Sequence, residues 1–184
     1  MIEAMTSRSG KAKLLEKYKG ALDVTKHKQR KANTCGPASL RIALKLLGFE
    51  KDEAWLVKQM TVTKLGTKPS GFKRVLRKLR LSYSEAHNAT IDDIRRFISR
   101  GFPVVVAWTF EGDGHYSLVT GATCEGISIF EPYSGRLIEI GYRRFAKLWR
   151  DPCNHTTRWV IAIISNQHED VSNSVLRTTN GENN

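Results

Sequence analysis

The chain of 184 residues is long enough for one domain and too short for two ordinary ones. Because 40% of its residues are hydrophobic and 26% are charged, the composition excludes a wholly disordered chain. The formal net charge is +12, and the excess lies in residues 1–80, which hold 20 basic and 6 acidic side chains, whereas residues 81–184 hold 10 and 12. This asymmetry predicts an acidic partner, unless the charge only maintains solubility.

The three cysteines, Cys35, Cys124 and Cys153, are odd in number and widely spaced, which argues against a disulfide scaffold and favours a reducing compartment. Residues 1–19 contain no apolar run typical of a secretory signal, and no stretch approaches the roughly 18 to 20 apolar residues of a membrane span. We therefore expect a cytoplasmic protein without a membrane span. Export by a route that reads no such signal stays open.

The first half of the chain is predicted to be helical. Residues 1–26 are predicted to form a mobile basic arm with room for a short helix over 13–19, and further helices are expected over 36–47, 52–60, 70–79 and 91–100. Pro37 lies in the first turn of the 36–47 helix, and Gly48 follows its last apolar residue. The 91–100 helix begins after Thr90, an N-cap residue with Asp93 three positions later.

The second half is predicted to form strands, because its segments are rich in Val, Ile and aromatic residues and are bounded by Gly, Pro, Asn and Asp. The expected strands cover residues 103–109, 115–120, 126–130, 136–140 and 159–164, with a short helix over 142–149. Helices followed by strands indicate an α+β fold. The expected domain spans residues 27–165, and residues 166–184 are predicted to be a disordered tail.

Cys35, in the run NTCGPASL, immediately precedes the 36–47 helix. The positive end of a helix favours a thiolate, which is the nucleophilic form of cysteine. A cysteine in this position is more often a small buried hydrophobic residue, so the catalytic interpretation depends on its partners. Covalent catalysis by a thiol needs a histidine to move the proton and a third group to orient the imidazole.

His115 is the one histidine among five that begins an expected core strand. The strand that begins at His115 and the strand that ends near Glu131 flank a turn at 123–125. In an antiparallel pair, the residue numbers of facing residues have a nearly constant sum, the index sum. An index sum of 246 places these two side chains opposite each other. A slip of one residue would move one of them to the other face. Asp113 is a second candidate to orient His115, but a residue in the EGDG stretch is more typical of a turn.

Acyl chemistry also needs hydrogen-bond donors for the oxyanion, and the side-chain amide of Gln29, six residues before Cys35, could supply one. By contrast, Cys124, Cys153 and His155 lack the paired spacing of a zinc site. We expect neither a metal nor another cofactor.

The chain resembles the bacteriocin-processing, double-glycine peptidases in the order and spacing of six sequence elements. These elements are Gln29, Cys35-Gly36, Gly66-Thr67, the 103–108 strand, Gly114-His115-Tyr116 and the turn from Glu131 to Gly135. These belong to the papain-like cysteine peptidases, and the similarity spans about residues 27–165. The resemblance implies a papain-like fold in which a helical half carrying Cys35 packs on an antiparallel sheet. It also implies Cys35 as nucleophile, His115 as general base and acid, Glu131 as the third residue and Gln29 as oxyanion donor. The family usually has Asp-Pro where this chain has Glu131-Pro132.

Three functions follow from these residues. The first is a cysteine-dependent hydrolase of peptide or isopeptide bonds, acting on a peptide or protein substrate that is acidic if the basic half lines the cleft. The second uses the same thioester for glutamine deamidation, transglutamination or acyl transfer. The third is a non-catalytic basic module that binds nucleic acid or another acidic partner, and the absence of a recognised nucleic-acid motif argues against it.

Overall fold

The protein is described here by a computed structural model covering residues 27–164. The predicted basic arm at 1–26, with its helix at 13–19, and the predicted tail at 166–184 lie outside the described residues.

The helices occur where the sequence predicts them, with ends that differ by at most one residue. They are α2 (Cys35–Leu46), α3 (Glu53–Met60), α4 (Pro69–Lys78), α5 (Ile91–Ser99) and α6 (Tyr142–Leu148). Local capping explains two of the starts: the Asp52 carboxylate accepts a hydrogen bond from the Trp55 N–H, and Thr90 and Asp93 form a reciprocal capping box.

The strands form a six-stranded antiparallel sheet in the order β1-β8-β2-β3-β4-β5. Its members are β1 (Ser82–Ala86), β2 (Val104–Phe110), β3 (Asp113–Ala122), β4 (Gly126–Glu131), β5 (Arg136–Gly141) and β8 (Val160–Ile164). Strands β2 and β8 are buried on both faces, which explains why their sequences are nearly continuously apolar rather than alternating.

Three strands have no clear sequence signal. Strand β1, with the sequence SYSEA, is an edge strand without a fully buried residue, so it lacks the apolar pattern of the others. Strands β6 (Arg150–Asp151) and β7 (Thr156–Thr157) are two residues each and pair only with each other. They form a separate hairpin between α6 and β8, where the sequence predicts a loop.

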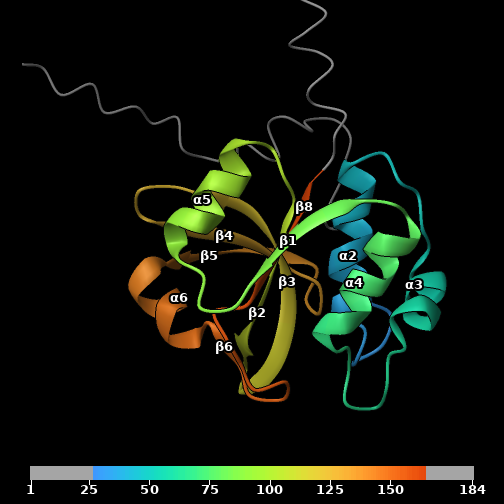
Figure 1. Cartoon of the computed structure of the whole chain (residues 1–184). Coiled ribbons are helices and arrows are strands. Elements are labelled where there is room, and N and C mark those ends of the chain that lie inside the picture. Colours follow the sequence, from blue (N-terminus) through green and yellow to red (C-terminus); the bar gives the residue numbers. More distant parts are fainter. Residues whose placement is uncertain (1–26, 165–184) are drawn as a thin grey trace, which may run out of the picture.

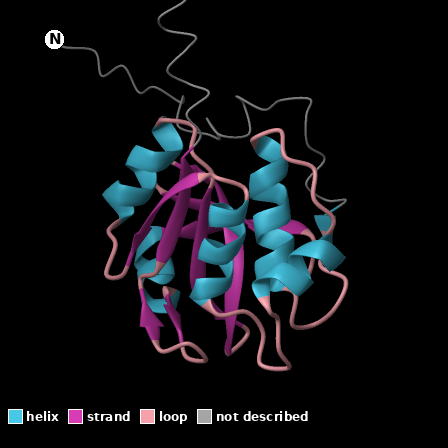
Figure 2. Cartoon of the chain, turned by 45° about the vertical axis from the view of Figure 1, so that its right-hand side comes forward, coloured by secondary structure: helices cyan, strands magenta, loops and turns pink. Residues whose placement is uncertain are grey.

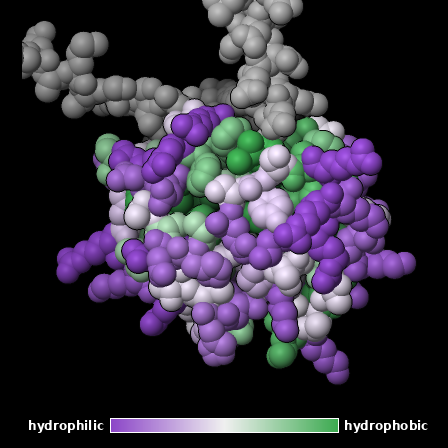
Figure 3. All heavy atoms as spheres, viewed as in Figure 1, coloured by the Kyte–Doolittle hydropathy of each residue, from purple (hydrophilic) through white to green (hydrophobic). Residues whose placement is uncertain are grey.

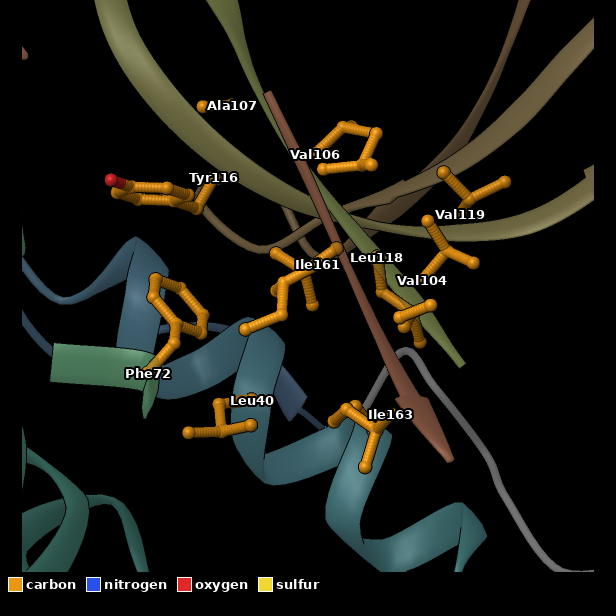
Figure 4. Packing of buried hydrophobic residues seen from close by; sticks show 14 of the residues in the cluster. Leu40, Phe72, Val104, Val106, Ala107, Tyr116, Leu118, Val119, Ile161 and Ile163 are labelled. Atoms are coloured by element: carbon orange, nitrogen blue, oxygen red, sulfur yellow. The ribbon is translucent and has the colours of Figure 1, made fainter. Parts of the chain in front are cut away.

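The sheet lies between two groups of helices, with α2, α3 and α4 on one side and α5 and α6 on the other (Figure 1). The view in Figure 2 shows the same layers from another direction. Leu40 of α2 and Phe72 of α4 face Tyr116, Ile161 and Ile163 of the sheet, and all five are buried (Figure 4). This core fixes the position of α2 against β3, and therefore of the residues at their ends. The predicted α+β arrangement of a helical half on an antiparallel sheet is confirmed.

Hydrophilic residues cover much of the surface seen in Figure 3. Within residues 27–164, no helix combines the length and the apolar character needed to cross a bilayer.

Candidate active site

Cys35 is the first residue of α2, and its side chain is buried. The loop before it is held by Glu53 of α3, whose carboxylate accepts hydrogen bonds from the Thr34 hydroxyl at 2.7 Å and the Arg30 N–H at 3.0 Å. First-turn N–H groups of a helix lack intrahelical acceptors. The N–H groups of Cys35 and Gly36 therefore point along the helix axis and can donate to a group bound at the start of α2. The predicted placement of Cys35 at a helix start is confirmed.

His115 lies on β3, opposite Trp108 of β2. The next residue, Tyr116, accepts a hydrogen bond at its carbonyl from the Ser39 hydroxyl, 3.0 Å away. Ser39 is one helical turn beyond Cys35, so this bond joins the turn that carries the thiol to the strand that carries the imidazole. The ring of Phe110 lies 5.3 Å from the imidazole, centroid to centroid, and covers part of it.

Glu131, the last residue of β4, contacts His115 directly. Its Oε1 atom lies 2.6 Å from the His115 Nε2 atom, and the carboxylate is fully buried. The predicted contact between the two side chains is therefore present, although the predicted register is wrong. Strands β3 and β4 pair Leu118 with Phe130, which gives an index sum of 248 instead of 246.

The register differs because the turn lies later than predicted: Ala122 pairs with Ile127, a sum of 249 that centres the turn between residues 124 and 125 instead of at 123. A bulge lies between Val119 and Gly121, and the turn is held by the Thr123 hydroxyl, which accepts from the N–H groups of Glu125 and Gly126. The shift amounts to two residues, and side chains two positions apart on a strand share one face. His115 and Glu131 therefore meet diagonally instead of directly across the ladder.

The glutamate at position 131 is also bound by the turn that follows it. Its Oε1 accepts the Tyr133 N–H and its Oε2 accepts the Ser134 N–H, both at 2.6 Å. The side chain thus folds back over Pro132 while still reaching His115. This second set of bonds fixes the carboxylate of Glu131 from the turn as well as from His115.

The protonation of the pair follows from these contacts. Burial lowers the pKa of His115, but the side chains of Cys35 and Glu131 outweigh burial and raise it to about 9. Burial raises the pKa of Glu131, but the hydrogen bonds with His115, Ser134 and Tyr133 outweigh burial and lower it to about 2. At neutral pH the pair is imidazolium and carboxylate. Because Nε2 faces Glu131, Nδ1 is the ring nitrogen left for Cys35.

Gln29 is buried beside this turn, and its backbone N–H donates to the carbonyl of Pro132 at 2.8 Å. Its side-chain Nε2 donates to the carbonyls of Lys31 at 2.7 Å and Ala32 at 3.0 Å. The loop before Cys35 and the turn after Glu131 are therefore joined through Gln29. Both amide hydrogens are directed at the protein backbone, so an oxyanion role requires one of them to turn towards the substrate.

The sequence gives no indication of the role of the β6–β7 hairpin. The Asp151 carboxylate accepts the N–H groups of Cys153 and Asn154, and the Asn154 amide donates to the Tyr116 hydroxyl at 3.4 Å. A Cβ atom on Gly114 would lie 2.0 Å from the Asp151 Oδ1 atom, so glycine is required there. The DPCN stretch is typical of a turn, but only the fold places it beside His115.

The remaining candidates lie elsewhere. Asp113 is exposed at the start of β3, opposite Phe110. Cys124 and Cys153 are exposed free cysteines, and residues 27–164 contain no group of three or more His, Cys, Asp or Glu side chains suited to a metal. A thiol, an imidazole and a carboxylate in series are the groups needed for nucleophilic attack on a carbonyl.

The model of the peptidase C39 family matches residues 23–153. No curated protein is significantly similar to the chain in sequence.

Several solved structures share the fold. The peptidase domain of Streptococcus ComA, a bifunctional ABC transporter involved in quorum sensing, superposes with a TM-score of 0.63 at 20% identity, covering 76% of this chain and 96% of that one. A C39-like peptidase from Bacillus anthracis gives a TM-score of 0.61 at 13% identity and covers 76% and 93%. A double-glycine-motif protease from an AMS/PCAT transporter, in complex with a leader peptide, gives 0.58 at 17% identity and covers 75% and 89%.

Proposed function

This chain belongs to the peptidase C39 family, whose members are papain-like cysteine peptidases, and we propose that it cleaves a peptide bond with Cys35 as nucleophile, His115 as proton carrier and Glu131 as the group that orients His115. The observation that carries this proposal is the buried 2.6 Å contact between His115 and Glu131, with Cys35 close enough to raise the pKa of the same imidazole. A buried histidine that only packs would not need a carboxylate and a thiol as its side-chain partners.

The reaction follows from these positions. The Cys35 thiolate attacks the carbonyl carbon, and a carbon–sulfur bond forms while the carbonyl oxygen becomes an oxyanion. His115 then gives the proton on Nδ1 to the leaving amine, and the carbon–nitrogen bond breaks to leave a thioester. Water, deprotonated by His115, then attacks the thioester carbonyl; the carbon–sulfur bond breaks, which releases the carboxyl product and regenerates the Cys35 thiolate beside the protonated His115. Glu131 holds the imidazole by Nε2 throughout and stabilises its charged form.

The oxyanion is stabilised at the start of α2. The N–H of Cys35 is one donor, because first-turn N–H groups have no partner within the helix. Gln29 is the second donor once one of its amide hydrogens leaves the carbonyl of Lys31 or Ala32 for the substrate. Its attachment to Pro132 keeps this amide beside the turn that holds Glu131.

The substrate is a peptide, and peptides with two adjacent glycines are the first to test, since one similar structure is a double-glycine-motif protease bound to a leader peptide. Intact-mass spectrometry of the protein with such peptides should show cleavage and a transient acyl adduct on Cys35. Neither should appear with Cys35→Ala, while Cys124→Ala should behave as the wild type. Equal cleavage by Cys35→Ala would refute the proposal. An adduct that resolves onto an amine instead of water would change the reaction to acyl transfer at the same site.

A further inference from the structure

A pocket of about 500 Å³ adjoins the candidate site on the side of Gln29 and the Glu131 turn. Its lining combines the loop before Cys35 with the turn after Glu131 and the start of β5, and consists of Lys28, Gln29, Arg30, Lys31, Ala32, Tyr133, Ser134 and Arg136. These two segments are 101 residues or more apart in sequence (133 − 32), and the bond from the Gln29 N–H to the Pro132 carbonyl joins them. The pocket is therefore created by the fold and is not a feature of one loop.

The lining is strongly cationic. It contains four basic side chains and no acidic one, and all four basic residues are exposed. Within residues 27–164, the ion pairs use other cations, namely Arg41, Lys45, Lys73, Arg95, Arg96 and His115. Four like charges around one hollow repel each other, and an anion placed among them would relieve that repulsion.

The pocket is directly connected to the groups proposed for catalysis. Tyr133 and Ser134 line it, and their N–H groups hold the Glu131 carboxylate. Gln29 lines it as well, and its amide holds the loop that leads to Cys35 by donating to the Lys31 carbonyl. A peptide lying across Cys35 would therefore pass over or beside this pocket within a few residues of the bond that is cleaved.

We propose that this pocket binds acidic side chains of the peptide substrate that lie next to the cleaved bond. Arg30 and Arg136 offer planar groups that bind a carboxylate with two parallel hydrogen bonds, while Lys28 and Lys31 add point charges. Tyr133, 52% exposed, provides an aromatic surface for the peptide between them. The inference rests on the proposed peptidase function, and it assigns the charge asymmetry of the chain to substrate selection.

The test uses binding and turnover separately. Binding is measured with Cys35→Ala and fluorescent peptides in which two glycines are followed, or in a second set preceded, by three glutamates, with glutamine in the matched peptides. At about 25 mM salt we expect one glutamate peptide to bind roughly tenfold more tightly than its glutamine partner, and the difference to fall below about twofold near 500 mM salt because exposed charges are screened. Turnover by the wild type should show the same preference in kcat/KM.

Arg136→Glu and Lys28→Glu should each abolish the preference in binding affinity for the glutamate peptide over its glutamine partner. Arg143→Glu, an equal change of charge on α6, should leave this preference intact. Two results would overturn the inference while leaving the peptidase proposal standing. One is equal binding of the glutamate and glutamine peptides in both sets at low salt, and the other is a preference for glutamate that Arg143→Glu removes as well. Acid-selective binding by Cys35→Ala without any turnover by the wild type would instead support the pocket and refute the peptidase. Tighter binding of a single-stranded oligonucleotide than of the glutamate peptides would assign the pocket to another partner and overturn the inference.

Discussion

Glu131 is the residue on which the geometry of the site depends. Its carboxylate accepts hydrogen bonds from the His115 ring, the Tyr133 N–H and the Ser134 N–H. One buried group therefore both orients the imidazole and stabilises the turn. The sequence indicates that His115 and Glu131 are neighbours, because His115 begins the first expected strand of one hairpin and Glu131 ends the second. It does not reveal the two turn bonds, because a glutamate that accepts from its own following residues has no distinctive spacing.

The change Glu131→Gln should shift the pH profile. Loss of the carboxylate removes one of the two contacts that raise the pKa of His115 to about 9, so the imidazolium should lose its proton at lower pH. The alkaline limb of kcat/KM, near pH 9 in the wild type, is expected to move towards neutrality and the maximum to fall. Glu139→Gln, a change on the exposed side of β5, is the matched control. An unmoved alkaline limb in Glu131→Gln would show that Glu131 does not act on His115.

The same pair should make stability depend on pH. His115 has a folded pKa above its ordinary value of 6.5, so its contribution is complete below about 6.5 and is lost as pH rises through about 9. Glu131 has a folded pKa below its ordinary value of 4.5, so its contribution is complete above about 4.5 and is lost as pH falls towards 2. Urea unfolding should give the greatest contribution between about pH 4.5 and 6.5. A difference between wild type and Glu131→Gln that is constant with pH would contradict this.

At the scale of elements, the site depends on where α2 meets β3 and on the small hairpin of β6 and β7. The helix periodicity, the capping residues and the glycine stops predict all five described helices, because those signals are local. The predicted register of β3 and β4 is off by two residues, because the residues of the turn do not reveal where the turn is centred. Strands β1, β6 and β7 are stabilised by contacts distant in sequence, and their own residues carry no apolar pattern.

The change Gly114→Ala tests the contact between β3 and the β6–β7 hairpin. The new Cβ atom would lie 2.0 Å from the Asp151 Oδ1 atom, so either the strand or the hairpin must move. We expect a loss of about 1–3 kcal/mol in the free energy of unfolding, measured with urea, and reduced turnover because His115 is the next residue. The double variant Gly114→Ala with Asp151→Ala should be no less stable than Asp151→Ala alone. Simple additivity of the two losses would contradict the steric explanation.

At the scale of the whole molecule, the basic half of the chain does not coincide with the set of residues proposed for catalysis. The groups proposed for catalysis come from both halves of the chain, with Cys35 and Gln29 in the basic half and His115 and Glu131 in the near-neutral half. Composition alone predicts only an acidic partner. The fold adds that four of the basic side chains gather beside the proposed site, where they can act on the substrate.

The central claim is that Cys35 is an activated nucleophile, and the relative reactivity of the three cysteines tests it most directly. Cys35 is 6% exposed, whereas Cys124 and Cys153 are exposed. If exposure governed reactivity, Cys35 would be labelled last. With limiting iodoacetamide near neutral pH and peptide mapping by mass spectrometry, we predict that Cys35 is alkylated first and that His115→Ala removes this advantage. Labelling of Cys124 and Cys153 before Cys35 in the folded wild-type protein would contradict the account.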